Sequence, residues 1–430
     1  MTEIEYFQLV QNNFWIFISI FVAALLLYYF LLSSKIVSLF DPLLISFIGS
    51  AMGFTTVVLL YVTGTIDGRY FLSYLATQTA FMAGFVFAFS PSAPARVGIL
   101  RLLPQVSASS ALLVVLPIYS FTCVVYYAKF GIPLLSDVSR LESYYQSDVV
   151  SSLLNKIYNP TAIIAAALAV ACFQAKAVTV RIASRVTLVL VTANVLLSGS
   201  KGSLLVIVGI IYYCAIFFER SGRPLANALT RMVKAHPLLL VFIVFGGFIL
   251  VAWIRYDVGP LAILTVRVAM SGDIYYLAYP NHVLDNIHTS GILPALFPGW
   301  GSLLGVQEKG LPLGGQVFEY VMGYELLEAP NARHNVFGLV HLGYVFSVLY
   351  SCFLGYLLGF ARFRLLLYSK RCVAGLVMFV GVTFALSGIE ADAGLAISNV
   401  IGTVICATVY LFAAALLERA VQRDMKVHEG

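Results

Sequence analysis

The chain has 430 residues, of which 60% are apolar and 11% are charged, and its mean hydropathy is +0.93. These values lie far outside the composition of soluble globular domains, so we place the chain among membrane proteins. Its net charge of +6 is explained by membrane topology, so neither a nucleic acid nor an acidic soluble partner is expected.

Apolar runs near 20 residues long recur along the chain, and this is the length that an α-helix needs to cross about 30 Å of hydrocarbon. Barrel strands would be shorter and would alternate in polarity. We therefore predict an all-α fold, a polytopic transmembrane helical bundle in which residues 1–430 form one integral membrane domain. About eleven spans are expected, near residues 14–33, 42–63, 71–90, 109–127, 159–175, 183–198, 203–218, 237–254, 336–360, 372–388 and 395–417.

The positions of lysine and arginine predict the orientation of the bundle. With the C-terminus inside, about two thirds of the 26 Lys and Arg residues fall on the cytoplasmic side. Lys and Arg are most concentrated in the short loops 219–234 and 361–371. In short loops the tendency of Lys and Arg to stay on the cytoplasmic side is most reliable. Residues 255–335 therefore form a long external loop and residues 128–158 a second one. Residues 1–13 lack the basic region of a cleaved signal and are expected to remain, facing outward.

Other features narrow the function classes. The six cysteines lie in spans or at a span edge without any CxxC pair, and the six histidines are scattered, so we predict neither a disulfide framework nor a structural zinc site. The predicted spans carry almost no ionisable residue at their centres, whereas ion-coupled carriers commonly place such groups at mid-membrane depth. This pattern counts against ion-driven transport.

One candidate anion site precedes the span at 203–218, which runs from outside to inside. It begins after Ser198-Gly199-Ser200-Lys201-Gly202, so the free N–H groups of the helix start point outward. The glycines allow close approach of a phosphate, Ser200 can donate a hydrogen bond and Lys201 adds a cation. A diphosphate suits this group, and the alternative is a Gly/Ser turn with a snorkelling lysine.

A second basic helix start precedes the span at 336–360. Asn335 is the expected N-cap, and Arg333 and His334 come directly before it. A histidine beside an arginine and a positive helix end is biased toward the neutral form, which can accept a proton from a hydroxyl. His334 is therefore a candidate general base, and the alternative is a capping or interfacial histidine. His341, seven residues further on, either supports His334 or packs between helices.

The long external loop contains its own candidates. Residues 259–280 predict an apolar surface helix interrupted by Arg267 and Asp273. Such an arginine can grip a phosphate bidentately at headgroup level, and the alternative is snorkelling or pairing with Asp273. Residues 292–315 are rich in glycine and proline and predict an irregular lid.

Sugar contacts and a reserve acid or base come from the external loops. Aromatic and charged residues suit sugar faces and hydroxyls, with structural loop contacts as the alternative, and the candidates are Arg140, Arg255, Tyr275 and Tyr276. In the short outer loop 388–394, Glu390 and Asp392 are the reserve acid or base. The two carboxylates also leave open a Mg²⁺ or Mn²⁺ site, whereas we favour capping of the last span and predict no metal or cofactor. For His282, His288 and Asp285 the alternatives are a metal site and a polar surface loop, and we favour the polar surface loop.

Taken in order, these motifs resemble a known family. Ser198-Gly-Ser-Lys201-Gly at a helix start, Arg267 early in the long loop, and His334-Asn335-Val-Phe337 reaching Gly343 are similar to the O-antigen polymerase and O-antigen ligase superfamily. The resemblance covers mainly residues 190–350. It implies a membrane glycosyltransferase of the GT-C type whose donor is an undecaprenyl-diphosphate-linked oligosaccharide, used at the periplasmic face of the bacterial inner membrane. Polymerase members join such repeat units into a chain.

The resemblance also implies roles for individual residues. Arg267 and Lys201 would hold the diphosphate, Arg333 would support them and His334 would activate the acceptor hydroxyl. Lys201 stands where an arginine is more usual, which removes the bidentate fork at that position. The implied partners are membrane lipids and a chain-length regulator. Two alternatives stay open: a ligase that moves glycan onto lipid A core, and a glycolipid flippase or other transporter.

Overall fold

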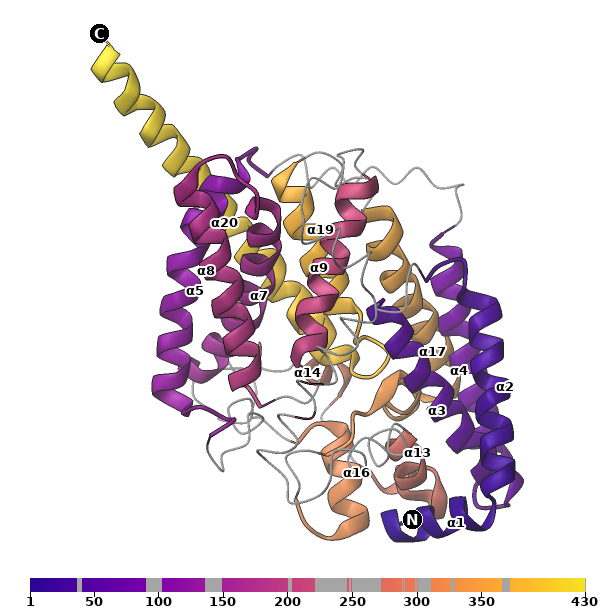
Figure 1. Cartoon of the computed structure of the whole chain (residues 1–430). Coiled ribbons are helices and arrows are strands. Elements are labelled where there is room, and N and C mark those ends of the chain that lie inside the picture. Colours follow the sequence, from indigo (N-terminus) through magenta and orange to yellow (C-terminus); the bar gives the residue numbers. More distant parts are fainter. Residues whose placement is uncertain are drawn as a thin grey trace. The chain divides into compact units, whose positions relative to one another are not determined.

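The computed structural model describes residues 1–36, 41–89, 103–135, 149–199, 203–220, 272–287, 291–297, 311–325, 329–365 and 372–429, together with the single residues 246, 249, 289 and 300. Regular structure within these ranges is helical (Figure 1). Among them, seven helices are long and apolar enough to cross a membrane, and three shorter apolar helices cover 46–62, 205–219 and 373–386. The prediction of an all-α, polytopic helical membrane protein is thereby confirmed.

Every predicted span except 237–254 coincides with an apolar helix, and 237–254 lies outside the described residues apart from 246 and 249. The two main shifts in a boundary are at α20 (Ala393–Glu429), which continues past the predicted end at 417, and at α7 (Val149–Cys172), which begins well before the predicted start at 159. The interior of α7 contains Pro160. Membrane helices tolerate such a proline because neighbouring helices and hydroxyl side chains satisfy the freed backbone groups. The last part of the predicted loop 128–158 is therefore helical.

Contacts divide the chain into two compact units. Unit 1 contains residues 1–89, 258–359 and 387–397, and unit 2 contains residues 90–257, 360–386 and 398–430. The single integral membrane domain expected from the sequence stays a prediction, as does the side of the membrane on which each loop lies.

Unit 2 has a central helix, α7. In its span 78% of the residues are buried, against 28% in the spans of α5 and α8, because four helices of the unit, α5, α8, α9 and α19, pack against α7. The helices of unit 2 are α5 (Ala108–Phe130), α7, α8 (Val178–Leu197), α9 (Ser203–Arg220), the π-helical turn η4 (Phe360–Leu365), α19 (Val373–Leu386) and most of α20 (Ala393–Glu429).

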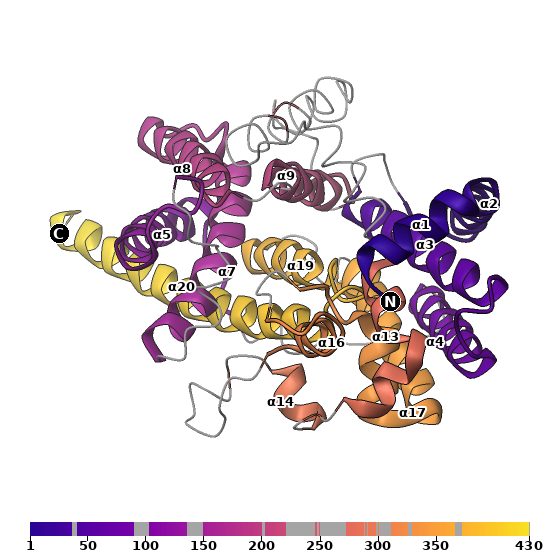
Figure 2. The same ribbon diagram turned by 90° about the horizontal axis from the view of Figure 1, so that it is seen from below.

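Unit 1 combines long helices with short segments of the predicted external loop (Figure 2). Local signals set the helix starts: Thr2 and Glu5 form a capping box on the first helix, and the Asp41 carboxylate accepts a hydrogen bond from the Leu43 N–H at the start of another. The helices are α1 (Glu3–Asn12), α2 (Phe14–Leu32), α3 (Pro42–Val62), α4 (Gly68–Phe87), α13 (Asp273–Ala278), the 3-10 helix η3 (Pro280–Asn286), α14 (Ile292–Leu296), α16 (Leu313–Met322) and α17 (Arg333–Gly359).

α17 is folded back on itself at Gly343, whose φ of 71° and ψ of −175° are non-helical. The Nδ1 atom of His334 lies 3.0 Å from the Oγ atom of Ser351, whereas a straight helix would separate these residues by about 25 Å. The element is therefore a hairpin of a short arm, residues 333–342, and a long arm, residues 344–359. The predicted span at 336–360 therefore contains a reversal at Gly343, where only glycine adopts such a backbone without strain.

The long arm packs backbone to backbone on α4. A Cβ atom added to Gly84 would lie 2.0 Å from the Cys352 carbonyl oxygen, and one added to Gly355 would lie 1.9 Å from the Phe81 carbonyl oxygen. Glycines at such a contact let two membrane helices approach closely. The short arm is consequently held against a rigid pair of helices.

Part of the predicted external loop is buried inside unit 1. In α13, Tyr275 and Tyr276 are 1% and 0% exposed, and the Tyr276 ring stacks on Tyr6 with centroids 4.2 Å apart. The residues 273–278 of the predicted surface helix are thus covered by protein, while 259–271 lie outside the described residues. The predicted irregular lid at 292–315 contains the short helix α14 and the first residues of α16, so these parts of it are helical.

Candidate functional site

The start of the short arm lies against a tight turn at residues 388–392. The backbone N–H groups of Arg333 and His334 donate to the carbonyl oxygens of Ala391 and Glu390, at 3.0 and 3.1 Å. These helix-start N–H groups are therefore satisfied by the protein itself. Arg333 has a φ of 46°, a left-handed conformation that residues other than glycine rarely adopt and that is found repeatedly at functional sites.

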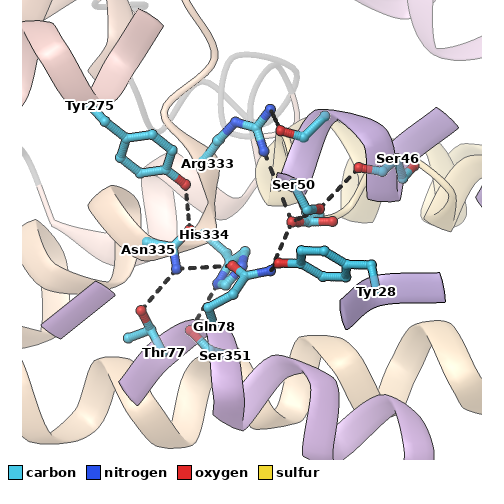
Figure 3. A network of polar contacts seen from close by, with 12 residues as sticks. Tyr28, Ser46, Ser50, Thr77, Gln78, Tyr275, Arg333, His334, Asn335 and Ser351 are labelled. Atoms are coloured by element: carbon cyan, nitrogen blue, oxygen red, sulfur yellow. Dashed lines mark hydrogen bonds and ion pairs between the residues drawn. The ribbon is translucent and has the colours of Figure 1, made fainter. Parts of the chain in front are cut away.

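Asn335 is a helical residue with a packing role, so its prediction as the N-cap is wrong. Its side-chain oxygen accepts a hydrogen bond from the Tyr275 hydroxyl at 2.7 Å. Its amide donates to Thr77 Oγ1 at 2.9 Å and to Gln78 Oε1 at 3.3 Å (Figure 3). Asn335 does not cap the helix, because carbonyl oxygens of the turn at 388–392 already accept hydrogen bonds from the N–H groups at the helix start. The Asn335 side chain instead joins α13 and α4 to the short arm.

The Arg333 guanidinium occupies a groove made by two glycines of α3. Its Nη2 donates to the Gly49 carbonyl oxygen at 3.0 Å, and a Cβ atom at Gly49 would lie 3.3 Å from Nη2. A Cβ atom at Gly53 would lie 2.8 Å from the Tyr275 ring, which faces the guanidinium at 5.9 Å. Any larger residue at these glycines would displace the arginine or the tyrosine. The Arg333 side chain is only 10% exposed.

Glu390 faces Arg333 from the 388–392 turn. Its Oε1 lies 3.9 Å from Arg333 Nη1 and accepts hydrogen bonds from the Ser50 hydroxyl and, at 3.2 Å, from the Gln78 amide. Burial raises the pKa of the Glu390 carboxyl above its ordinary value, and Arg333, Ser50 and Gln78 oppose that shift. The second carboxylate oxygen, Oε2, is buried without a hydrogen-bond partner among the described residues.

His334 is completely buried beside this pair. Its ring stacks on Phe81 with centroids 4.7 Å apart, and Nδ1 faces Ser351 Oγ. In the part of the chain that the structure describes, Nε2 has no hydrogen-bond partner. The arrangement therefore presents one cation and two buried polar atoms, His334 Nε2 and Glu390 Oε2, that have no hydrogen-bond partner among the described residues. The backbones of His334 and Glu390 are joined by a hydrogen bond.

The polar network reaches the middle of α4. Gln78 is near the centre of the 20-residue α4, about 15 Å from either end, and it also donates to the Tyr28 hydroxyl of α2 at 2.9 Å. Arg333, at the start of α17, and Glu390, in the turn at 388–392, contact each other and Glu390 contacts Gln78, so charged groups reach this depth although the sequence has almost no charge at the centres of the predicted spans.

Other predicted site residues have structural partners. Asp392 accepts a hydrogen bond from the Leu395 N–H at 2.8 Å and caps α20, as favoured from the sequence. His341 lies 3.3 Å from Thr289 Oγ1 and packs on Phe337. Asp285 pairs with Arg69 at 2.8 Å on an exposed edge. Among the described residues, no group of three or more His, Cys, Asp or Glu side chains is arranged to hold a metal ion.

Five predicted site residues lie outside the described residues, so their approach to Arg333 stays a prediction: Arg140, Ser200, Lys201, Arg255 and Arg267. Tyr275 and Tyr276 are buried, and their role as sugar contacts also stays a prediction. Sequence reasoning missed Ser50, Gln78 and Ser351. A glutamine near the middle of a predicted span was the available signal, because a polar amide at that depth needs partners.

Comparison with protein-family models, with curated proteins and with solved structures finds no match to this chain.

Proposed function

We propose that this chain is a bacterial inner-membrane glycosyltransferase that polymerises undecaprenyl-diphosphate-linked oligosaccharide repeat units at the periplasmic face. Its sequence motifs resemble the O-antigen polymerase and ligase superfamily. The observation that carries the proposal is the adjacent pair Arg333 and His334, held in a strained turn with the guanidinium in a glycine groove and one imidazole nitrogen open.

The proposed chemistry needs these residue types. Transfer breaks the bond between the anomeric carbon and the diphosphate oxygen, and the negative charge that builds on the leaving diphosphate is stabilised by the Arg333 guanidinium. The acceptor hydroxyl forms the new bond to that carbon and gives its proton to His334 Nε2. In this proposal Arg267 and Lys201 add further cations to the diphosphate. Glu390 holds Arg333 in place and is the reserve base.

Access to this site requires a local opening. His334 is fully buried and the Tyr275 ring faces the Arg333 guanidinium, so in this proposal binding of the lipid-linked donor displaces part of the surrounding protein. Closure of a loop over the bound donor would then exclude water, which otherwise competes with the acceptor hydroxyl.

Purified protein in lipid vesicles, supplied only with lipid-linked repeat units, tests the proposal. We expect a ladder of lengthened glycans and release of undecaprenyl diphosphate. His334→Gln should slow chain growth by about 10²–10⁴-fold, because the base is lost. His341→Gln, a change seven residues away in the same short arm, is the matched control and should leave chain growth within about threefold of the wild type.

Three outcomes would contradict the proposal. Full activity in His334→Gln would remove the general base. Transfer only when a lipid A core acceptor is added would indicate a ligase. Movement of the glycolipid across the bilayer without bond formation would indicate a flippase, the second candidate, which is favoured by the mid-helix depth of the Arg333 and Glu390 pair.

A further inference from the structure

His334 is held by three different segments, two of which contact its ring. The backbone N–H of His334 is bound to the Glu390 carbonyl oxygen, the ring plane stacks on Phe81 of α4, and Nδ1 faces Ser351 of the long arm. The interplanar angle to Phe81 is 20°. Rotation of the ring would break both the stacking and the contact to Ser351, so Nε2 is held in one direction.

We propose that Ser351 is a positioning residue that keeps the proton of neutral His334 on Nδ1, so that Nε2 presents a lone pair to a hydroxyl of the ligand. The identification of that hydroxyl as the acceptor sugar's rests on the proposed function. The tautomer itself does not depend on that function.

Two physical arguments support this assignment. A neutral imidazole carries one proton, and which nitrogen holds it is set by the partner of the other nitrogen. With the proton on Nδ1, Ser351 Oγ accepts it, and the buried Nε2 is an acceptor that waits for a donor. With the proton on Nε2, the protein would bury an N–H without any acceptor among the described residues, which is the rarer kind of unsatisfied group.

The hairpin explains why this contact exists. Ser351 follows His334 by 17 residues and reaches it only because the chain reverses at Gly343. Ser351 is itself fully buried. The neighbouring Ser347, one turn earlier on the long arm, is equally buried, but its hydroxyl donates to the Tyr344 carbonyl oxygen at 2.8 Å. The two serines therefore share an environment and differ in their partner.

Proton transfer by this arrangement balances. The acceptor hydroxyl donates a hydrogen bond to Nε2 and loses its proton there as its oxygen bonds to the anomeric carbon. The electron pair of the broken bond leaves with the diphosphate. The ring becomes a cation with Nδ1–H still bound to Ser351 Oγ, so Ser351 orients the ring both before and after the transfer.

Nitrogen NMR of the full-length protein, labelled with ¹⁵N-histidine and held in lipid nanodiscs, tests the tautomer directly. Protonated and unprotonated ring nitrogens resonate far apart, and the His334 signals are identified by their loss in His334→Gln. We expect an unprotonated Nε2 and a protonated Nδ1 near neutral pH. A protonated Nε2 in the wild-type protein would overturn the inference even if the protein polymerises glycan.

Kinetics give the second readout. Ser351→Ala should lower kcat by about 10–100-fold with little change in KM, because the ring loses its orienting partner. Ser351→Cys keeps the side-chain volume but offers a weak acceptor, so it should behave like Ser351→Ala. Ser351→Thr keeps the hydroxyl and should recover most of the activity, and Ser347→Ala should match the wild type.

These results distinguish failure of the Ser351 inference from failure of the proposed function. Wild-type kcat in Ser351→Ala and Ser351→Cys would exclude positioning by Ser351. Loss of fold in Ser351→Thr leaves the decision to the NMR spectrum and to Ser351→Cys. A protein that shows the expected tautomer but never lengthens glycan would retain the Ser351 inference and contradict the proposed function instead.

Discussion

Each unit contains a buried polar network, and the two networks differ in charge and in completeness. In unit 2, the Asn194 side chain of α8 donates to the Tyr119 hydroxyl at 2.6 Å and accepts from the hydroxyls of Tyr158, at 2.6 Å, and Tyr127. All groups are neutral and each of these atoms has a partner. In unit 1, the network contains Arg333 and Glu390, and two acceptor atoms have no partner among the described residues.

The difference indicates which network serves stability. A closed, neutral network joins α5, α7 and α8 in the way that amides and hydroxyls join membrane helices. A buried ion pair seldom stabilises a fold more than apolar packing would, and open acceptors are unfavourable in a buried site. The unit 1 network is therefore the better functional candidate of the two, and the comparison can be tested by substitution on both sides.

The largest effect is expected from Arg333. Arg333→Met should nearly abolish chain growth and lower the stability by about 3–5 kcal/mol near neutral pH, because Glu390 loses its partner in a buried site. The double variant Arg333→Met/Glu390→Gln removes both charges and should recover most of that stability without recovering activity. Thermal unfolding in detergent and the glycan assay measure the two effects. An active double variant would show that the guanidinium is dispensable, and the unit 1 network would then be structural like that of unit 2.

A change in the unit 2 network should lower the stability and leave the activity nearly unchanged. Asn194→Leu leaves the hydroxyls of Tyr119, Tyr127 and Tyr158 with fewer partners and should lower the stability by about 1–3 kcal/mol, while activity per folded molecule changes by less than about threefold. Thr187→Val is the control in the same helix and should have a smaller effect, because the Thr187 hydroxyl donates to the Ala183 carbonyl oxygen of its own helix. A selective loss of kcat in Asn194→Leu would end the distinction between the two networks.

The smallest effect concerns pH. Since burial raises the pKa of Glu390 above its ordinary value of 4.5, the carboxyl holds its proton to a higher pH in the folded protein than in the unfolded chain. The contribution of the Glu390 carboxyl to the stability of the fold is fully present below pH 4.5. It is lost as the pH rises through the pKa that Glu390 has in the folded protein. Wild-type melting temperature should therefore fall relative to that of Glu390→Gln as the pH is raised. Parallel curves would mean an unshifted carboxyl, and the opposite slope would mean that Arg333 outweighs burial.

Several parts of the candidate site were accessible from the sequence. Arg333, His334 and Glu390 were singled out because charged groups beside helix starts are conspicuous in a chain with 11% charged residues. The pairing of Arg333 with Glu390 could not be predicted from the sequence, because 57 positions separate the two residues. Asn335 was misassigned as a cap, since no local pattern shows that the carbonyl oxygens of a distant turn already occupy the helix start.

By itself, the sequence determined the class of the protein and the positions of the long apolar helices that the structure describes, because the length of an apolar run matched to a bilayer is a local property. Only the tertiary structure decided that α17 folds back at Gly343, that Gly49 and Gly53 make room for the guanidinium, and that Ser351 meets His334. With 33 glycines in the chain, the composition does not mark which one reverses a helix and which ones accept a neighbour. That choice depends on the volume and hydrogen bonds of side chains from distant segments, which come together only in the folded protein.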